Sequence, residues 1–254
     1  MKITLLGTGT SQGVPVITCD CKVCTSTVLK DKRLRSSVMI EVDKKVFVID
    51  TGPDFRQQML REKVRRLDAV LFTHHHKDHV AGMDDVRAFN HRWKEDIQVY
   101  CSRRTEDALK NEFPYVFSEK KYPGTPKVNI NTIENKNFMI QDTIITPIEA
   151  RHYLMPVLGF RIKDFVYLTD VSSISFDEKD KMKNADLIIL DALRKEKHIS
   201  HFSLDQALEL LEELKPKQAL LTHISHYMGL HHEVNKELPN HIKLAYDGQQ
   251  ITLV

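Results

Sequence analysis

"FTHHHKDH" (residues 72–79) decides the fold, because it places four histidines and one aspartate within six residues, directly after an apolar run that predicts a buried strand. Alternate residues at a strand end can point the same way, so His74 and His76 can share one metal while Asp78 and His79 turn toward a second position. Imidazole with carboxylate suits Zn, Mn or Fe, and the spacing differs from the helical H-E-x-x-H pattern. A solvated polar loop is the alternative, and this density of ligands makes it the weaker one.

The composition is that of one large globular domain, which we expect to span residues 1–254, since 41% of the 254 residues are hydrophobic. A net charge of +2, from 37 basic and 35 acidic residues, argues neither for nor against nucleic acid. No apolar stretch approaches the ~18 residues of a membrane span, and the N-terminal one is too short for a signal peptide. The cytosol is therefore the expected compartment, where clustered cysteines indicate a metal or redox site rather than disulfides.

Strand-like and helix-like segments occur in both halves of the chain. The β-rich runs "SVMIEV" and "KVFVID" flank a hairpin signal at "DKK" (43–45). A helix is predicted to begin after Ser203, because Gln206 three residues later completes a capping-box pattern. Leu204, Leu208 and Leu211 keep one face of that helix apolar. This distribution predicts an α/β (α+β) fold with two sheets packed face to face and helices outside.

Three later residues extend the histidine pattern, because each closes a β-rich run: His152 in "EARH", Asp170 in "VYLTD" and His223 in "ALLTH". Taken singly, each has an ordinary alternative as a surface or turn residue. In this order, after "THHHKDH", they resemble the metallo-β-lactamase fold superfamily over nearly the whole chain. The resemblance implies a four-layer αββα sandwich with two metals.

The ligand sets follow from that resemblance. It implies one metal on His74, His76 and His152, and another on Asp78, His79 and His223, with Asp170 and a hydroxide bridging the two. Asp50 in "FVIDTGPD" also matches a family aspartate, which would orient a metal-bound histidine. A turn-capping role for Asp50 is almost as well supported.

"TCDCKVC" (18–24) places Cys19, Cys21 and Cys24 in a loop at about residues 8–36, which the superfamily resemblance does not explain. A closed zinc site needs four ligands, commonly three Cys and one His. Cys101 lies in the apolar run "IQVYC" and is more simply a buried small hydrophobe. If the loop folds back over the rim of the metal site, His226, three residues after His223, can complete a structural zinc site. A redox or fortuitous cluster is the alternative.

The cysteine loop, with "GTGTSQGVP", "DTGPDFR", "DALR", "HISHFSLDQAL" and "LTHISH", resembles the PhnP-type cyclic-phosphate phosphodiesterases of the carbon–phosphorus lyase pathway. That resemblance implies a metal-dependent phosphoric diester hydrolase with two catalytic metals (Zn or Mn) and one structural Zn. It implies small substrates such as cyclic nucleotides or ribosyl cyclic phosphates, attacked by the bridging hydroxide, and a homodimer as the assembly.

His201, just before the capped helix, is the expected donor of a proton to the leaving alkoxide. His198 matches the family pattern less well, and packing against the loop is the simpler alternative for His201. Asp78 and Asp170 are expected to serve catalysis as well as metal binding. "KDKRLRSS" (30–37) is either a nucleic-acid contact or a solvated loop, and we favour the loop.

Other functions remain alternatives. A nuclease of the tRNase Z type usually carries a long basic arm, for which we find no segment, and a thioester hydrolase does not explain the cysteines. Asp170 argues against β-lactam hydrolysis. A non-enzymatic metal-binding role would not need an open dinuclear centre.

Overall fold

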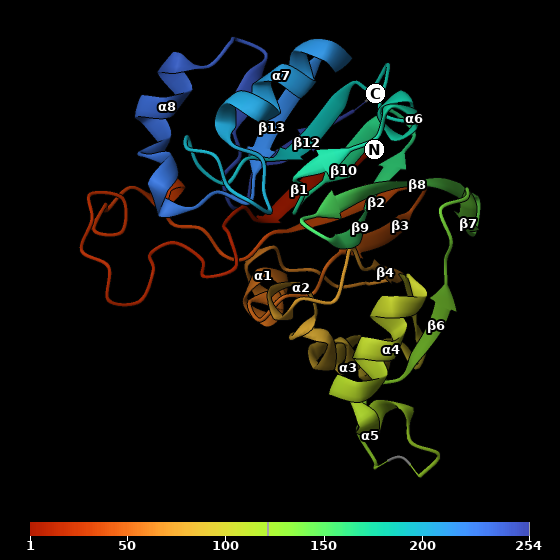
Figure 1. The fold of residues 1–254 in the computed structure, drawn as a ribbon. Coiled ribbons are helices and arrows are strands. Elements are labelled where there is room, and N and C mark those ends of the chain that lie inside the picture. Colours follow the sequence, from red (N-terminus) through yellow and green to blue (C-terminus); the bar gives the residue numbers. More distant parts are fainter. Residues whose placement is uncertain (121, 254) are drawn as a thin grey trace.

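Two β-sheets packed face to face form the centre of the computed structural model, which describes residues 1–120 and 122–253 (Figure 1). The first sheet has the strand order β15-β1-β2-β3-β4-β5-β6, and the second has the order β11-β8-β9-β10-β12-β13-β14, with β7 paired to β8. The strands of the first sheet are β1 (Lys2–Gly7), β2 (Ser37–Val42), β3 (Lys45–Ile49), β4 (Ala69–Leu71), β5 (Ile97–Cys101), β6 (Val128–Thr132) and β15 (Gln250–Thr252). Those of the second are β7 (Phe138–Ile140), β8 (Thr143–His152), β9 (Met155–Ile162), β10 (Phe165–Leu168), β11 (Ser173–Ile174), β12 (Leu187–Asp191), β13 (Gln218–Thr222) and β14 (Ile242–Leu244).

Helices cover the outer faces of both sheets (Figure 1). On the first sheet lie α1 (Phe55–Arg61), α2 (Lys77–Val80), α3 (Arg87–Trp93), α4 (Arg103–Glu112) and α5 (Pro114–Phe117), with the 3₁₀ turn η2 (Met83–Val86). The helices α6 (Phe176–Asp180), α7 (Leu204–Leu214) and α8 (His231–Glu237) lie on the side of the second sheet, as does the 3₁₀ turn η3 (His226–Met228). The 3₁₀ turn η1 (Leu29–Asp31) belongs to the cysteine loop, where Asp31 accepts the backbone N–H of His231 at the start of α8. The predicted capping box of α7 is present, since Ser203 and Gln206 exchange side chain–backbone hydrogen bonds. The predicted αββα order is confirmed.

The sheets have this arrangement because their strands are apolar on both faces. In β3, Phe47 and Ile49 point between the sheets, while Val48 belongs to the cluster under the helices. In β12, Leu187 and Ile189 point between the sheets, while Ile188 packs toward α7. Successive strand residues face opposite sides, so two-sided burial of this kind requires a layer on each face. At about 25 cal/mol per Å² of apolar surface removed from water, this burial dominates the stability of the fold.

The β2–β3 hairpin turns at the predicted position. Val42 pairs with Lys45, and both turn residues, Asp43 and Lys44, have positive φ values of 49° and 64°. Positive φ at both central residues is the type I′ geometry, whose twist matches that of the flanking strands.

Several candidate functional residues lie at the ends of neighbouring strands, along one edge of the second sheet. β10, β12 and β13 run parallel, so Asp170, Asp191 and His223 follow or close neighbouring strands at the same edge. Asp50, Asp170 and His223 all adopt positive φ, at 65°, 56° and 58°. Non-glycine residues rarely adopt this conformation, and such strain concentrates at functional sites.

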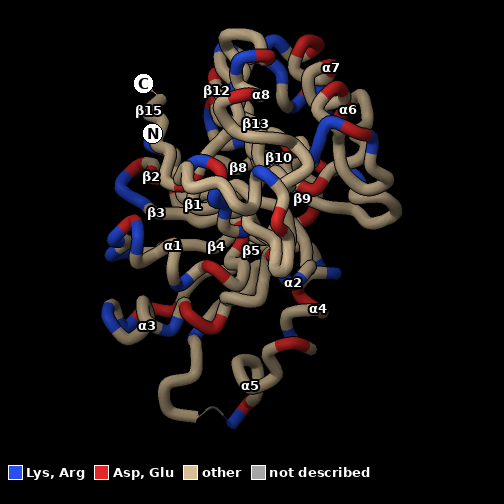
Figure 2. Tube along the Cα trace, turned by 90° about the vertical axis from the view of Figure 1, so that its left-hand side faces the viewer, with Lys and Arg blue, Asp and Glu red and all other residues tan. Residues whose placement is uncertain are grey.

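The cysteine loop (8–36) extends from β1 and packs beside the start of α8 (Figure 1). Val14, Val23 and Cys24 form a small apolar cluster with Leu230, the residue before α8. Figure 2 shows basic and acidic residues interspersed along the chain. No helix in residues 1–120 and 122–253 is long and apolar enough to cross a membrane.

The prediction that "KDKRLRSS" is a solvated loop is wrong for its arginines. Arg33 is only 4% exposed, and its guanidinium donates to Thr8 Oγ1 at 2.8 Å and to the carbonyl of Ala245 at 2.6 Å. Arg35 donates to both carboxylate oxygens of Asp54, at 3.0 and 3.1 Å. Arg33 anchors the loop from inside, because a buried guanidinium must be satisfied by acceptors, and the partly exposed Arg35 ties the loop to Asp54.

Candidate metal centre

The first group of potential ligands is His74, His76 and His152, whose ligand atoms lie within 4.8 Å of one another. His74 and His76 follow β4 as the sequence predicts, and His152 ends β8. The Nδ1 atom of His152 lies 2.8 Å from the carbonyl of Ser200, and that of His74 lies 3.0 Å from Thr73 Oγ1. Occupied Nδ1 atoms leave Nε2 as the coordinating atom.

The second group is Asp78, His79, Asp170 and His223, which meets the same distance limit. Asp170 lies between the two rings, with Oδ2 3.2 Å from His79 Nε2 and Oδ1 3.3 Å from His223 Nε2. Asp78 Oδ2 is 3.1 Å from His79 Nε2. Asp170 also forms a group with His152, so it reaches toward the first set of ligands.

Asp50 orients His79 from behind the site. Its Oδ2 lies 2.7 Å from His79 Nδ1, and Oδ1 accepts the backbone N–H of Thr73 at 2.9 Å. Both Asp50 and His79 are fully buried. Gly52 brings this turn against Asp78, since a Cβ at Gly52 would lie 2.1 Å from the Asp78 carbonyl oxygen. The contact with His79 favours the orienting role over turn capping.

The carboxylates of the second group favour protonated forms of the histidines beside them. Burial opposes ionisation of Asp170, but His223 and His79 hold its pKa well below the usual range. Burial would lower the pKa of His79, yet Asp78, Asp170 and Asp50 together raise it well above normal. The pKa of His223 rises to about 9, since Asp170 and Asp78 outweigh burial. A divalent cation would supply the charge that these carboxylates otherwise draw onto imidazole.

The donor set fits divalent metals. The Nε2 atoms of buried His74, His79 and His223 have no hydrogen-bond partner within residues 1–120 and 122–253, although each lies among other potential ligands. Buried polar atoms without partners are rare and require an explanation. Imidazole and carboxylate donors are those that zinc and manganese accept.

His201 lies beside both groups without belonging to either expected ligand set. Its ring centroid is 4.6 Å from that of His152 and 4.7 Å from that of His223. It is 8% exposed, whereas His198, the weaker candidate, is nearer the surface, with its ring centroid 5.3 Å from that of His201. The position is suited to a group that acts on a substrate bound between the two ligand sets.

Asp191 is a residue of the site to which our sequence analysis gave no role. It is fully buried, and its Oδ2 lies 3.3 Å from His201 Nδ1. A signal was present, because "LIILD" is a strand flanked in the sheet by strands leading to Asp170 and His223. Parallel neighbours end at one edge, so an aspartate closing the middle strand is placed between them.

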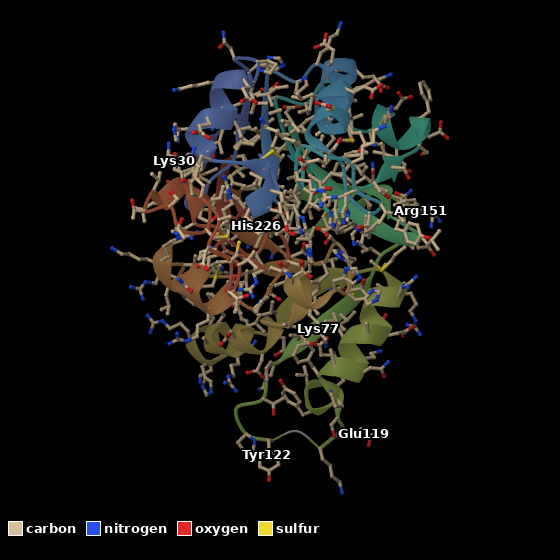
Figure 3. The ribbon with its side chains drawn as sticks, turned by 60° about the vertical axis from the view of Figure 1, so that its left-hand side comes forward. Lys30, Lys77, Glu119, Tyr122, Arg151 and His226 are labelled. Atoms are coloured by element: carbon tan, nitrogen blue, oxygen red, sulfur yellow. The ribbon has the colours of Figure 1, made fainter. Side chains whose placement is uncertain are left out.

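The cysteine cluster is brought together with His226. The Sγ atoms of Cys19, Cys21 and Cys24 lie 3.1, 3.5 and 3.3 Å from His226 Nδ1, and Figure 3 shows sulfur atoms close to the labelled His226. Tetrahedral zinc bonds of about 2.3 Å to sulfur and 2.0 Å to nitrogen separate S from N by about 3.5 Å. A hydrogen bond from the Cys24 backbone lowers the pKa of Cys21 to about 6, whereas burial raises the pKa of Cys24 to about 11, so the thiolate is favoured at Cys21 and needs the metal at Cys24. Cys101 is fully buried in another apolar cluster, as predicted.

A pocket of about 540 Å³ opens beside His76 and His152. Its other walls include Arg104 at the start of α4 and three exposed side chains, Tyr153, Leu154 and Ile199. The volume is within the usual range for small-molecule sites. The first group of ligands is therefore accessible to a substrate with an apolar or aromatic part.

Known proteins resemble this chain over its full length. A solved structure described as a "New Diphosphatase from the PhnP Family" has a TM-score of 0.93 and 38% identity, covering 100% of this chain and 98% of that one. Zn²⁺-bound PqqB from Methylobacterium extorquens shares the fold, with a TM-score of 0.82 and 17% identity, covering 100% of both chains.

A curated relative named "Octanoyltransferase", from Porphyromonas gingivalis, is 38% identical over 251 residues, which are 98% of this chain. The match covers 51% of that relative, so this chain spans about half its length.

The family model for the "Beta-lactamase superfamily domain" matches residues 45–224, which include the histidine motif, His152, Asp170 and His223. With the two-sheet fold, this match shows that the chain belongs to the β-lactamase superfamily of metallo-β-lactamase fold hydrolases and resembles its PhnP family.

Proposed function

We propose that this protein is a dinuclear metal-dependent phosphodiesterase acting on small phosphodiesters such as cyclic nucleotides or ribosyl cyclic phosphates. The observation that carries the proposal is that the two ligand groups are neighbours beside an open pocket. His76 and His152 of the first group line the pocket, and Asp170 of the second group has a ligand atom within 4.8 Å of one on His152. The cytosol stays the expected compartment, because its reducing conditions keep the cysteines available as metal ligands.

Two divalent cations in this centre would supply an activated water and positive charge for an in-line displacement at phosphorus. The chain holds their ligands in place through Asp50 and the Ser200 carbonyl, which occupy the Nδ1 atoms of His79 and His152. His201 is positioned to give a proton to the departing oxygen, since its Nδ1 faces Asp191 and leaves Nε2 free.

A phosphoanhydride is the second candidate substrate. The solved structure from the PhnP family, at 38% identity, is described as a diphosphatase. A diphosphate differs from a phosphodiester in its leaving group, while the displacement at phosphorus is the same. The name "Octanoyltransferase" belongs to a protein of which this chain matches 51%, so the name does not say which half performs octanoyl transfer.

A substrate panel tests the proposal. The metal-loaded protein should hydrolyse 2′,3′-cyclic nucleotides and bis(p-nitrophenyl) phosphate. Hydrolysis of an adenosine diphosphate ester tests the phosphoanhydride, the second candidate substrate. A thioester, a β-lactam and a pre-tRNA represent the competing reactions. Turnover of only one of the last three would refute the proposal.

Arg104 is expected to contribute to binding rather than to chemistry. Arg104 lines the pocket and makes no ion pair among the described residues. Burial lowers the pKa of nearby His75, and the positive charge of Arg104 lowers it further. Arg104→Ala should raise KM about tenfold for a cyclic nucleotide carrying an additional 5′-phosphate, with kcat unchanged, because it removes uniform binding. Steady-state kinetics with and without the 5′-phosphate measure the effect.

Arg103→Ala is the matched control, because Arg103 pairs with Glu106 at 3.1 Å instead of lining the pocket. Equal KM changes for both substrates, or for both variants, would show that Arg104 does not contact the second anionic group.

Cys21→Ser is expected to remove one zinc and destabilise the fold with little effect on chemistry. Structural zinc contributes apparent binding energies of about 10–16 kcal/mol in zinc-finger peptides. A loss of only about 3 kcal/mol would lower Tm by about 6–12 °C in a chain of this size. Metal analysis and thermal melting measure both effects.

Cys101→Ala, a change at the remaining cysteine, should leave the zinc content unaltered. An unchanged zinc content in Cys21→Ser, or a Cys19–Cys24 disulfide in the isolated protein, would refute the zinc site.

A further inference from the structure

The hairpin turn between β8 and β9 carries apolar residues where other short hairpins of this protein carry polar ones. His152 pairs with Met155, so Tyr153 and Leu154 form a two-residue turn, and Tyr153 has a φ of 56°. Glycine, asparagine and aspartate are the residues that such turns favour. Three other two-residue turns of the described chain, between β2 and β3, β7 and β8, and β9 and β10, are formed by Asp43 and Lys44, Gln141 and Asp142, and Lys163 and Asp164. Turn chemistry therefore does not explain the tyrosine and leucine of the β8–β9 turn.

Both of these side chains are left in water. Tyr153 is 52% exposed and Leu154 is 76% exposed, and both line the pocket of about 540 Å³ beside the metal ligands. Ile199, from the loop before α7, is 68% exposed and lines the same pocket. Single exposed apolar residues are ordinary on a protein surface, but these three come from two separate segments and surround one pocket. They leave apolar surface that a bound ligand would remove from water.

The apolar walls of the pocket adjoin the residues that we assign to metal binding and to proton transfer. Tyr153 directly follows His152, and Ile199 lies two residues before His201. The carbonyl of Ser200, between Ile199 and His201, lies 2.8 Å from His152 Nδ1, and the ring centroids of His152 and His201 are 4.6 Å apart. We therefore expect the pocket to receive the part of the substrate whose oxygen departs beside His201.

The remaining walls of the pocket favour a flat aromatic group over an alkyl chain. Arg104, His75 and Ser200 line it together with the apolar side chains. Nucleobases stack on aromatic rings and on arginine guanidinium planes, and their polar edges form hydrogen bonds. An alkyl chain would cover the apolar walls, but it would remove Arg104 and His75 from water without offering them a polar partner.

We propose that this pocket is a nucleobase subsite, in which Tyr153 stacks on the base and Leu154 and Ile199 make apolar contacts with it. The inference rests on the proposed phosphodiesterase function, and it narrows the substrate class to nucleotides. In a 2′,3′-cyclic nucleotide the ribose carries both the base and the departing oxygen, which agrees with the position of the pocket walls next to His201. A ribosyl cyclic phosphate without a base would leave the three side chains uncovered.

Kinetics with and without the base test the subsite. The metal-loaded wild type should hydrolyse 2′,3′-cyclic AMP with a kcat/KM about 5–150-fold above that for 1-O-methylribose 2,3-cyclic phosphate, the range that base–aromatic stacking supplies. Tyr153→Asn, which suits the positive φ, should lose about tenfold on the nucleotide and nothing on the base-free substrate. Tyr153→Phe should keep the wild-type preference. Ile199→Ser, in an exposed loop, should also lose activity on the nucleotide alone.

Gln141→Asn is the matched control, because Gln141 occupies the same position in the β7–β8 turn, with a φ of 51°, and does not line the pocket. It should leave both substrates unaffected. Equal kcat/KM values of the wild type for the nucleotide and the base-free substrate would overturn the inference without any variant. If Tyr153→Asn fails to fold, Ile199→Ser and this comparison of wild-type substrates still decide.

Equilibrium binding separates the subsite from the reaction. Calorimetry of the metal-loaded protein with 3′-AMP, 1-O-methylribose 3-phosphate and n-octyl phosphate compares a base, a sugar and an alkyl chain on the same anionic group. The nucleotide should bind most tightly, and Tyr153→Asn should remove most of its advantage. Binding of n-octyl phosphate as tight as that of 3′-AMP would show that the pocket takes an apolar chain, which overturns the inference. If the wild type cleaves no phosphodiester, the proposed function fails, while calorimetry still decides whether the pocket binds a base.

Discussion

Asp170→Ala is expected to lose most of its bound metal and nearly all phosphodiesterase activity while keeping its fold. Asp170 lies 3.2 Å from His79 Nε2 and 3.3 Å from His223 Nε2, and it also groups with His152. Removing this carboxylate leaves two neighbouring cations without the negative charge between them, so both half-sites weaken. Metal analysis, circular dichroism and turnover of bis(p-nitrophenyl) phosphate measure the three effects.

Asp164→Ala is a suitable control, since this more exposed aspartate precedes the same strand, β10, at its opposite end. It should retain metal and activity. If Asp170→Ala kept two catalytic metals per chain and near-wild-type turnover, Asp170 would not connect the half-sites. If it failed to fold, Asp170→Asn, which preserves shape and hydrogen bonding, would decide the matter by its metal content.

The parts of the fold that the sequence predicts are those governed by local rules. The hairpin at 43–45 follows from turn chemistry, and the helix after Ser203 follows from its capping box. The αββα layers were implied by the resemblance to the metallo-β-lactamase fold superfamily, and strands that are apolar on both faces give the physical reason for them. The ligand sets were implied by the same resemblance, and the structure brings the strand ends that carry His152, Asp170 and His223 together at one edge.

The parts that were missed depend on contacts distant in sequence. Arg33 resembles a solvated basic residue, and only the fold shows that its guanidinium donates a hydrogen bond to the carbonyl of Ala245, far along the chain. Asp191 resembles the end of a buried strand, and its role depends on the proximity of His201 and His223. Charge or strand position alone cannot identify such residues, because burial turns an ordinary polar group into one that needs specific partners.

His201→Ala is expected to keep its full metal content and to lose about 10²–10⁴-fold in turnover for substrates with poor leaving groups. The ring lies against His152 and His223 but is outside both ligand sets that we propose for the catalytic metals. The loss should shrink for p-nitrophenolate, which is stable enough to depart without a proton. Metal analysis and a series of leaving groups of increasing pKa, measured on wild type and variant, test this expectation.

The slope of that series separates two roles that a single substrate cannot distinguish. A group that only binds phosphate stabilises every substrate of the series equally, so its removal shifts all rates by one factor. A proton donor contributes more as the leaving oxygen becomes more basic, so its removal steepens the dependence of rate on leaving-group pKa. Parallel lines would therefore refute the acid role. Loss of metal in His201→Ala would refute both roles, since the residue would then belong to the ligand set. Its Nδ1 lies 3.9 Å from Asp170 Oδ1, so this outcome is one that the measurement must test.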